Sequence, residues 1–156
     1  MAELAHKVVM GEGPIHTEEV IRRIREAFGL SRAGRRISEA VVAGLELCLR
    51  QGNIRKDGEF WSGYAATLKT PRNRRNAAAS VRRSDRIAPE EYRLAIETAL
   101  KSSVAAPQPE LVVLVARLLG YDRLGSDLES EVSGQIQALV GDARIENRAG
   151  NFSLVH

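Results

Sequence analysis

Residues 13–61 read GPIHTEEVIRRIREAFGLSRAGRRISEAVVAGLELCLRQGNIRKDGEFW, and they decide the fold that the sequence predicts. Apolar side chains recur at helical spacing over residues 20–28 and again over residues 37–48, which predicts two amphipathic helices joined by a bend. Asp57-Gly58 between two strand-like runs predicts a β-hairpin with a type I′ turn, in which both central residues need positive φ. A further short helix is predicted over residues 2–10.

A weaker copy of this pattern follows about 91 residues later. Glycines, apolar positions and one arginine recur in register, and Phe60 matches Phe152 after one inserted residue. The other matched pairs include Gly29/Gly120, Arg32/Arg123, Gly34/Gly125, Val41/Val132, Leu45/Ile136 and Ile54/Ile145. Helix, short strand, helix, helix and hairpin is the order typical of a winged helix-turn-helix domain. The predicted fold class is therefore mainly α with short β-hairpins, arranged as two tandem winged helix-turn-helix modules.

Charge is unevenly distributed between the predicted parts. The first module, residues 1–62, holds 10 basic and 9 acidic side chains, and the second, residues 88–156, holds 6 basic and 10 acidic. Between them, residues 63–87 lack helical periodicity and carry seven basic side chains against the single acidic Asp85. We expect residues 63–87 to be an exposed basic linker. Its cations suit non-specific phosphate binding, and an ordinary solvated tether is an equal alternative.

The composition limits the possible functions. One cysteine excludes an internal disulfide, and no apolar run has the length of a membrane span, so we expect a cytoplasmic protein with no membrane partner. The three histidines, His6, His16 and His156, have no cysteine or carboxylate at ligand spacing. We therefore expect no metal, no cofactor and no catalytic activity within this chain.

The two copies differ most at the start of the third helix of each module. The first copy has Arg35-Arg36 there, and the second has Ser126-Asp127. Arginines near the positive end of a helix cost roughly a few tenths of a kcal/mol each, so an external anion should offset this cost. In helix-turn-helix proteins this position faces DNA. The alternative is that both arginines are solvated or pair with Glu39.

The remaining candidate contacts with nucleic acid surround this position. Arg32 is expected either to touch phosphate or, because its counterpart is also an arginine, to tie the bend to a backbone carbonyl. Arginines on the outer side of residues 20–28 add a second basic surface. The predicted nucleic-acid-binding residues are Arg32, Arg35, Arg36, Ser38, Arg55, Lys56, Arg72, Arg74 and Arg75.

The second helix of each module differs in the opposite sense. VIRRIREAFG in the first copy becomes LVVLVARLLG in the second, so Val113, Leu114 and Ala116 replace three arginines. A helix that is apolar on nearly every side is expected to be covered on more than one side. These three residues are therefore the predicted protein interface, facing the first module, a twin chain in a homodimer, or the rest of a larger protein.

Residues 13–37 and 52–61 resemble a bacterial domain of unknown function, of the winged-helix type, near the C-termini of very large proteins. Those proteins carry a superfamily I helicase core and often a Vsr-like or restriction-endonuclease-like nuclease domain, and some are associated with defence against phage. The resemblance implies a C-terminal fragment whose partners are the helicase and nuclease domains of the same parent. No helicase motif or nuclease carboxylate cluster is present in the chain itself.

The sequence thus favours a non-enzymatic accessory module that engages double-stranded DNA through its first module and the linker. The runner-up is a protein–protein interaction scaffold, as in the kleisin-associated accessory subunits of bacterial condensin. A free-standing transcription regulator is a third possibility. Arg32, Arg35 and Arg36 discriminate between the first two: if internal ion pairs consume all three, the interaction scaffold is favoured.

Overall fold

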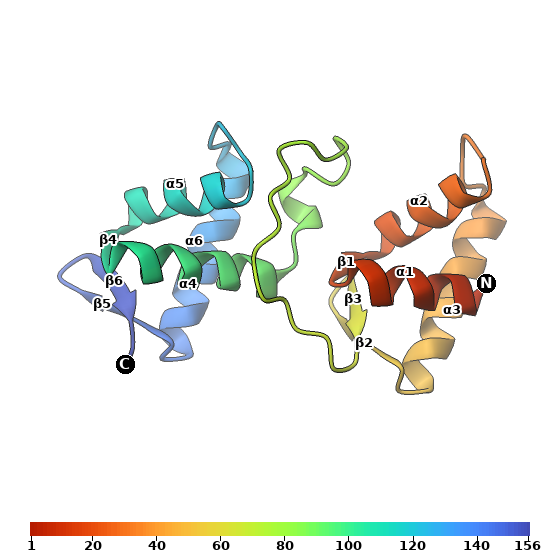
Figure 1. Cartoon of the computed structure of the whole chain (residues 1–156), viewed down its shortest axis with the longest axis horizontal. Coiled ribbons are helices and arrows are strands. Elements are labelled where there is room, and N and C mark those ends of the chain that lie inside the picture. The colour runs from red at the N-terminus through yellow and green to blue at the C-terminus, as the bar shows by residue number, and fades with distance from the viewer. The chain divides into compact units, whose positions relative to one another are not determined.

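The computed structural model describes all 156 residues, Met1–His156. The chain is mainly helical, with six α-helices and two three-stranded antiparallel sheets (Figure 1), which confirms the predicted fold class at this level. It divides into two units, Met1–Thr67 and Leu68–His156. Each unit has its own hydrophobic core, so each is described separately.

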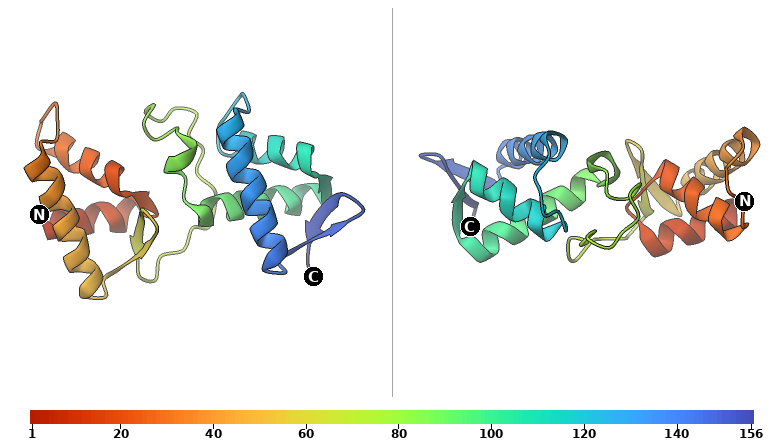
Figure 2. Two further views of the ribbon diagram at one scale, coloured as in Figure 1. Left: turned by 180° about the vertical axis from the view of Figure 1, so that it is seen from behind. Right: turned by 90° about the horizontal axis from the view of Figure 1, so that it is seen from above.

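The first unit packs three helices against one another and closes them with a small sheet. Its elements are α1 (Ala2–Glu12), β1 (Ile15–His16), α2 (Thr17–Ala27), α3 (Arg35–Arg50), β2 (Ile54–Asp57) and β3 (Phe60–Gly63). The strand order is β1-β3-β2, so the short first strand completes the hairpin. Figure 2 shows α3 lying across α1 and α2 when the unit is seen from behind. Val20, Ile24, Val41 and Leu45 form the centre of this core.

The second unit repeats this order after an additional 3-10 turn. Its elements are η1 (Ser84–Arg86), α4 (Pro89–Ser103), β4 (Ala105–Pro107), α5 (Gln108–Leu118), α6 (Ser126–Gly141), β5 (Ile145–Arg148) and β6 (Asn151–Leu154). The strand order β4-β6-β5 matches that of the first sheet. The bounds of α2, α3 and both hairpin strands are each reproduced 91 residues later, in α5, α6, β5 and β6.

This constant spacing corrects one match made from the sequence. Trp61 pairs with Ile15 in the first sheet, and Phe152 pairs with Ala106 in the second, 91 residues further on in both strands. Trp61 and Phe152 are also both buried, whereas Phe60 is only partly buried. The counterpart of Phe152 is therefore Trp61 and not Phe60, and the second hairpin contains no inserted residue.

The first hairpin also turns differently from the prediction. Asp57 pairs with Phe60, so the loop consists of Gly58-Glu59, and only Gly58 has a positive φ, of 56°. The predicted type I′ turn centred on Asp57-Gly58 is wrong, because the sheet register retains Asp57 as a strand residue. In the second hairpin both loop residues, Ala149 and Gly150, have positive φ, as a type I′ turn requires.

The prediction of an exposed basic linker over residues 63–87 differs most from what the structure shows. Residues 68–87 belong to the second unit. Arg74 in their middle is 4% exposed, and Ile87 at their end is part of the hydrophobic core. We call residues 68–87 the strap, because hydrogen bonds and ion pairs join several of them to α4 and to the segment that follows α5. None of the helices combines the length and the apolar character needed to cross a bilayer.

Candidate nucleic-acid interface

The start of α3 presents three arginines to solvent. Gly34 caps the helix, Arg35 and Arg36 are its first two residues, and no acidic residue lies in its first turn. Arg32 and Arg36 are exposed and form no ion pair. Arg35 donates from Nε to Oε1 of Glu39 at 2.6 Å, but its side chain remains 90% exposed. Exposed pairs at this spacing contribute only about 0.3–0.5 kcal/mol, so an anion can displace Glu39.

Ser38 has a lesser place at this surface. Its hydroxyl donates to the carbonyl oxygen of Gly34 at 3.5 Å, and the residue is partly buried. It lies one helical turn beyond the cap, so its backbone belongs to the same helix end as the arginines. Ser38 therefore shapes the start of α3 and offers no exposed charge.

The corresponding start of α6 has the opposite charge. Gly125 caps that helix, and its first turn contains Asp127 and Glu129. Arg123, the counterpart of Arg32, is also exposed and unpaired. The interpretation that both arginines tie their bends to a backbone carbonyl is therefore wrong, because neither makes such a hydrogen bond. Arg32 is left as a solvent-facing cation beside the start of α3.

The arginines of α2 form ion pairs within their own unit. Arg22 contacts both Glu19, at 2.7 Å, and Glu26, at 2.5 Å. Arg23 donates to Glu12 of α1 at 2.9 Å. Glu26 also lies 3.5 Å from the remaining arginine, at position 25. The expected second basic surface is thus neutralised within the unit, because carboxylates lie one turn away on α2 or opposite on α1.

The two cations before the hairpin tip are also held by their own unit. Arg55 donates from Nη2 to the carbonyl oxygen of Ala66 at 3.0 Å and is partly buried. Lys56 contacts Glu46 at 3.3 Å, and its Nζ lies 4.6 Å from the ring centroid of Trp61. Both side chains therefore attach the hairpin to neighbouring segments of the unit.

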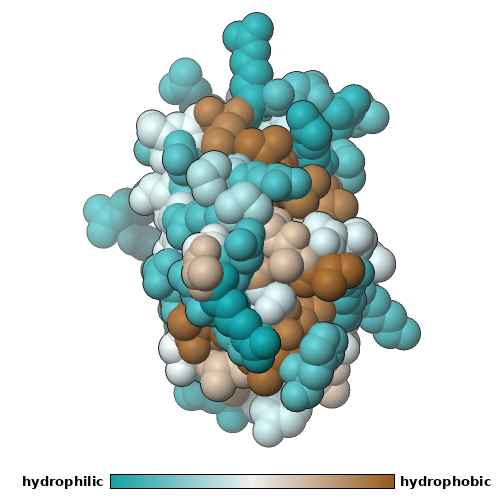
Figure 3. Space-filling view, turned by 90° about the vertical axis from the view of Figure 1, so that its left-hand side faces the viewer, coloured by the Kyte–Doolittle hydropathy of each residue, from teal (hydrophilic) through white to brown (hydrophobic).

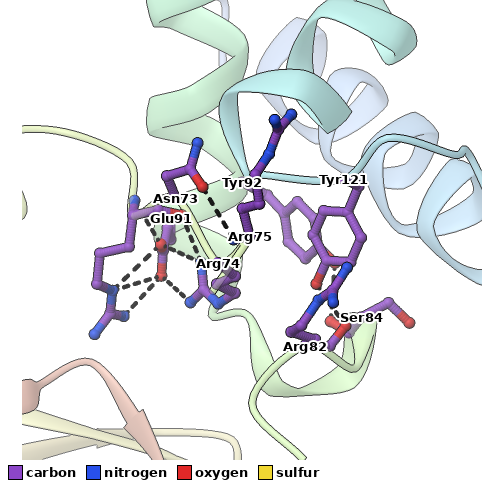
Figure 4. Close-up of polar contacts among 9 residues, drawn as sticks. Asn73, Arg74, Arg75, Arg82, Ser84, Glu91, Tyr92 and Tyr121 are labelled. Carbon is purple, nitrogen blue, oxygen red and sulfur yellow. Dashed lines mark hydrogen bonds and ion pairs between the residues drawn. The ribbon is translucent and has the colours of Figure 1, made fainter. Parts of the chain in front are cut away.

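The strap arginines converge on a carboxylate that sequence analysis missed. Glu91 in the first turn of α4 has no exposed surface and accepts hydrogen bonds from Arg72 and Arg74 (Figure 4). The shortest contacts are 2.7 Å from Arg72 and 2.6 Å from Arg74. Burial would raise the pKa of Glu91, but hydrogen bonds from Arg74 and Arg72 outweigh it and lower the pKa to about 2.

Further hydrogen bonds hold the strap along its length. The backbone N–H of Arg74 donates to Leu119 at 2.9 Å, and the hydroxyls of Tyr92 and Tyr121 donate to backbone carbonyls of the strap at 2.8 and 2.6 Å. Arg75 forms an exposed ion pair with Asp122 at 2.6 Å. The prediction of an exposed linker is therefore wrong for Arg74, and Arg72 and Arg75 are paired within the unit.

The sequence did contain one signal for this arrangement. Glu91 lies four residues before Ala95, on the side of α4 that carries the buried apolar residues. A carboxylate placed in an apolar face requires cations and hydrogen-bond donors around it. The seven basic residues just upstream are the available source.

The predicted protein-interface residues occupy different environments. Ala116 is 3% exposed and belongs to the core of its own unit, so it is not available to a partner. Val113 and Leu114 are partly buried on α5. Figure 3 shows several apolar areas on one face of the second unit, separated by polar side chains. The strap covers one end of α5. From the sequence, this helix was expected to be covered by the first module, a twin chain or the rest of a larger protein.

The chain has no group of three histidine, cysteine, aspartate or glutamate side chains placed to hold a metal ion. A family model described as a protein of unknown function (DUF3320) matches residues 1–39. This segment comprises α1, β1, α2 and the start of α3, and it includes all three solvent-facing arginines. No curated protein and no solved structure matches the chain. The chain is therefore similar, over its first 39 residues, to a domain whose function is unknown.

Proposed function

We propose that this chain is a non-enzymatic DNA-binding accessory module that contacts the backbone of double-stranded DNA through the start of α3. The observation that carries the proposal is the exposed charge at this helix end, where Arg32 and Arg36 form no ion pair and Arg35 is paired with Glu39 but remains 90% exposed. Most other arginines of this unit have a carboxylate or carbonyl partner, so the positive surface is concentrated at one helix end. Phosphate oxygens there would gain both the side-chain charges and the partial charge of the helix N-terminus.

We interpret each unit as a winged helix and the chain as a tandem pair. The order α1, β1, α2, α3, hairpin supports this interpretation, with α3 in the place of the recognition helix. The second unit has the same element order, but Asp127 and Glu129 at the start of α6 would repel phosphate. Only the first unit is therefore proposed to bind DNA, and the strap is no longer included in the DNA contact.

The broader setting is proposed from the sequence resemblance. The chain would be the C-terminal accessory part of a bacterial helicase–nuclease, acting in the cytoplasm and positioning the catalytic domains on duplex DNA. The match of residues 1–39 to a family model of unknown function supports the resemblance of the first unit to a domain of unknown function, and the link to helicase–nuclease proteins rests on the sequence resemblance alone. The helicase and nuclease activities would reside in those catalytic domains.

The test is a salt titration of binding to a fluorescently labelled 20-base-pair duplex, with single-stranded and forked DNA in parallel. We expect the logarithm of the affinity to fall linearly with the logarithm of the salt concentration. Arg35→Glu combined with Arg36→Glu should weaken binding by about tenfold or more and reduce the slope by about one for each lost phosphate contact. Single strands should bind less tightly, because the bend and the first turn of α3, residues 29–39, contain no aromatic side chain on which successive bases could stack.

The matched control exploits the repeat. Arg32→Glu and Arg123→Glu change the same charge at equivalent exposed positions, one in each unit. Arg32→Glu should weaken DNA binding, and Arg123→Glu should leave it nearly unchanged. Affinity without salt dependence, or an equal loss in both variants, would contradict the proposal.

A protein-interaction scaffold is the second candidate. It is favoured by the internal pairing of the α2 and strap arginines, which removes most of the charge expected to attract DNA. The scaffold would be favoured if Arg32, Arg35 and Arg36 were all in internal ion pairs. This condition is not met, because Arg32 and Arg36 are unpaired. A homodimer is one form of this candidate, and equilibrium sedimentation of the full chain tests it directly.

A further inference from the structure

We propose that the second unit binds an amphipathic helix of a partner protein in a groove between α4 and α5. The groove has a volume of about 510 Å³ and is lined mainly by apolar surface. Ala99, Leu114 and Leu118 supply its apolar lining, and Ser103, Glu110 and Arg117 are among its polar lining residues. The site lies in the second unit and does not depend on DNA binding by the first.

The first unit shows how the equivalent position is closed. There, Arg23 of α2 donates to Glu12 of α1 at 2.9 Å and joins the two helices across their outer surface. The residues 91 positions later are Leu114 and Ser103, which cannot form an ion pair. The second unit thus has an apolar groove where the first has a salt bridge, although the flanking helices correspond.

The lining charges indicate what the groove can accept. Glu110 and Arg117 are both exposed, and neither forms an ion pair. They lie seven residues apart on α5, which is about 10 Å along the helix axis. Leu114 lies between them on the same side of the helix, with Leu118 adjacent to Arg117. The stripe therefore offers an acid, an apolar centre and a base in order.

A helix with complementary chemistry fits this stripe. Its aliphatic side chains at i and i+4 would pack on Leu114 and Leu118, as ridges of one helix pack into the groove between two others. A lysine or arginine at one end would meet Glu110, and a carboxylate at the other end would meet Arg117.

Two designed 18-residue helical peptides test the proposal with the full-length chain. Both carry the same leucines at i, i+4 and i+7; one is flanked by lysine and glutamate, and the other by two glutamates. Calorimetry should show that the lysine–glutamate peptide binds the unmodified chain at least fivefold more tightly. Glu110→Lys should reverse this preference, because both charged groups at the groove are then cations. This comparison holds whichever way the peptide runs along the groove.

The control variant introduces into the second unit the ion pair that the first unit has at the equivalent position. Leu114→Arg combined with Ser103→Glu should build the ion pair that closes the equivalent position there and weaken peptide binding at least tenfold. A thermal melt by circular dichroism verifies that this variant is folded, and Arg23→Leu with Glu12→Ser provides the reciprocal change. Absence of binding by both peptides, or unchanged binding to the Leu114→Arg/Ser103→Glu variant, would overturn the proposal. A dimer of the unmodified chain that this variant dissociates would also overturn it, because the occupant would then be a second copy.

Discussion

At the residue scale, Glu91 is the charged group most completely buried and hydrogen-bonded in the structure. It is fully buried, and two arginine side chains and one backbone N–H donate to its oxygens. Removing one member of such a buried cluster usually destabilises a protein strongly, since the remaining charges lose their partner. Arg74 would be the charge left buried, because its side chain is only 5% exposed.

We therefore expect Glu91→Gln to lower the free energy of unfolding of the second unit by about 3–5 kcal/mol. Urea denaturation followed by circular dichroism measures this change. Asp122→Asn is the matched control, because it removes the carboxylate from the exposed Arg75–Asp122 pair and should cost less than about 1 kcal/mol. Equal effects of the two substitutions would show that Glu91 does not anchor the strap.

The same carboxylate should make stability depend on pH. Because the pKa of Glu91 is lowered from 4.5 to about 2 in the folded state, its contribution is fully present above pH 4.5. It is lost as the pH falls from 4.5 towards 2, and it amounts to about 3 kcal/mol. Chemical denaturation between pH 6 and pH 2.5 should show this loss in the unmodified chain and a smaller one in Glu91→Gln. A pH dependence unchanged by the substitution would contradict this assignment.

At the scale of single elements, the ends of α3 and α6 provide a natural comparison. Both helices end with the same three backbone hydrogen bonds, and the second residue after each helix has positive φ: Gly52 at 72° and Ala143 at 55°. A side chain added at Gly52 would meet no atom within 4 Å, so only backbone strain distinguishes the two residues. Alanine in this conformation costs roughly 1 kcal/mol relative to glycine.

Exchanging these residues should move stability in opposite directions. Gly52→Ala should destabilise the first unit by about 1 kcal/mol, and Ala143→Gly should stabilise the second by up to about 1 kcal/mol. Thermal unfolding of the two variants measures both changes. Gly134→Ala is a useful control, because Gly134 lies within α6 with open space around it and a φ outside the left-handed region, so alanine should not destabilise the unit. Destabilisation by Ala143→Gly would contradict the strain argument.

The elements themselves could largely be predicted from the sequence. Apolar spacing located the helices, because side chains that face the core, such as Val20 and Leu45, recur every three or four positions along a helix. The turn of the first hairpin could not be predicted in the same way. Its position depends on the register of β2 against β3, in which Asp57 pairs with Phe60, and β3 is also paired with β1, which is distant in sequence.

At the scale of the whole molecule, the strap was the least predictable part. Its alternation of cations with alanine, serine and proline has the composition of a disordered segment. Its main carboxylate partners, Glu91 and Asp122, follow 17 or more residues later, and only the folded helices bring them to the arginines. For the candidate interface, the contrast between the two copies identified Arg35 and Arg36. It could not distinguish exposed arginines from those of α2, because pairing depends on side-chain positions.

The hydrogen bonds and ion pairs of the strap also determine which of its peptide bonds a protease can reach. Trypsin cleaves after lysine and arginine, and the strap contains seven such residues, so an unfolded strap would be cut throughout. In the folded chain, limited digestion should begin after exposed Lys69 and proceed slowly after Arg72 and Arg74, whose side chains are held by Glu91. Mass spectrometry of timed digests measures the order, and Glu91→Gln should accelerate the slow cuts. Equally rapid cleavage after Lys69 and Arg74 in the unmodified chain would mean that the strap is open in solution.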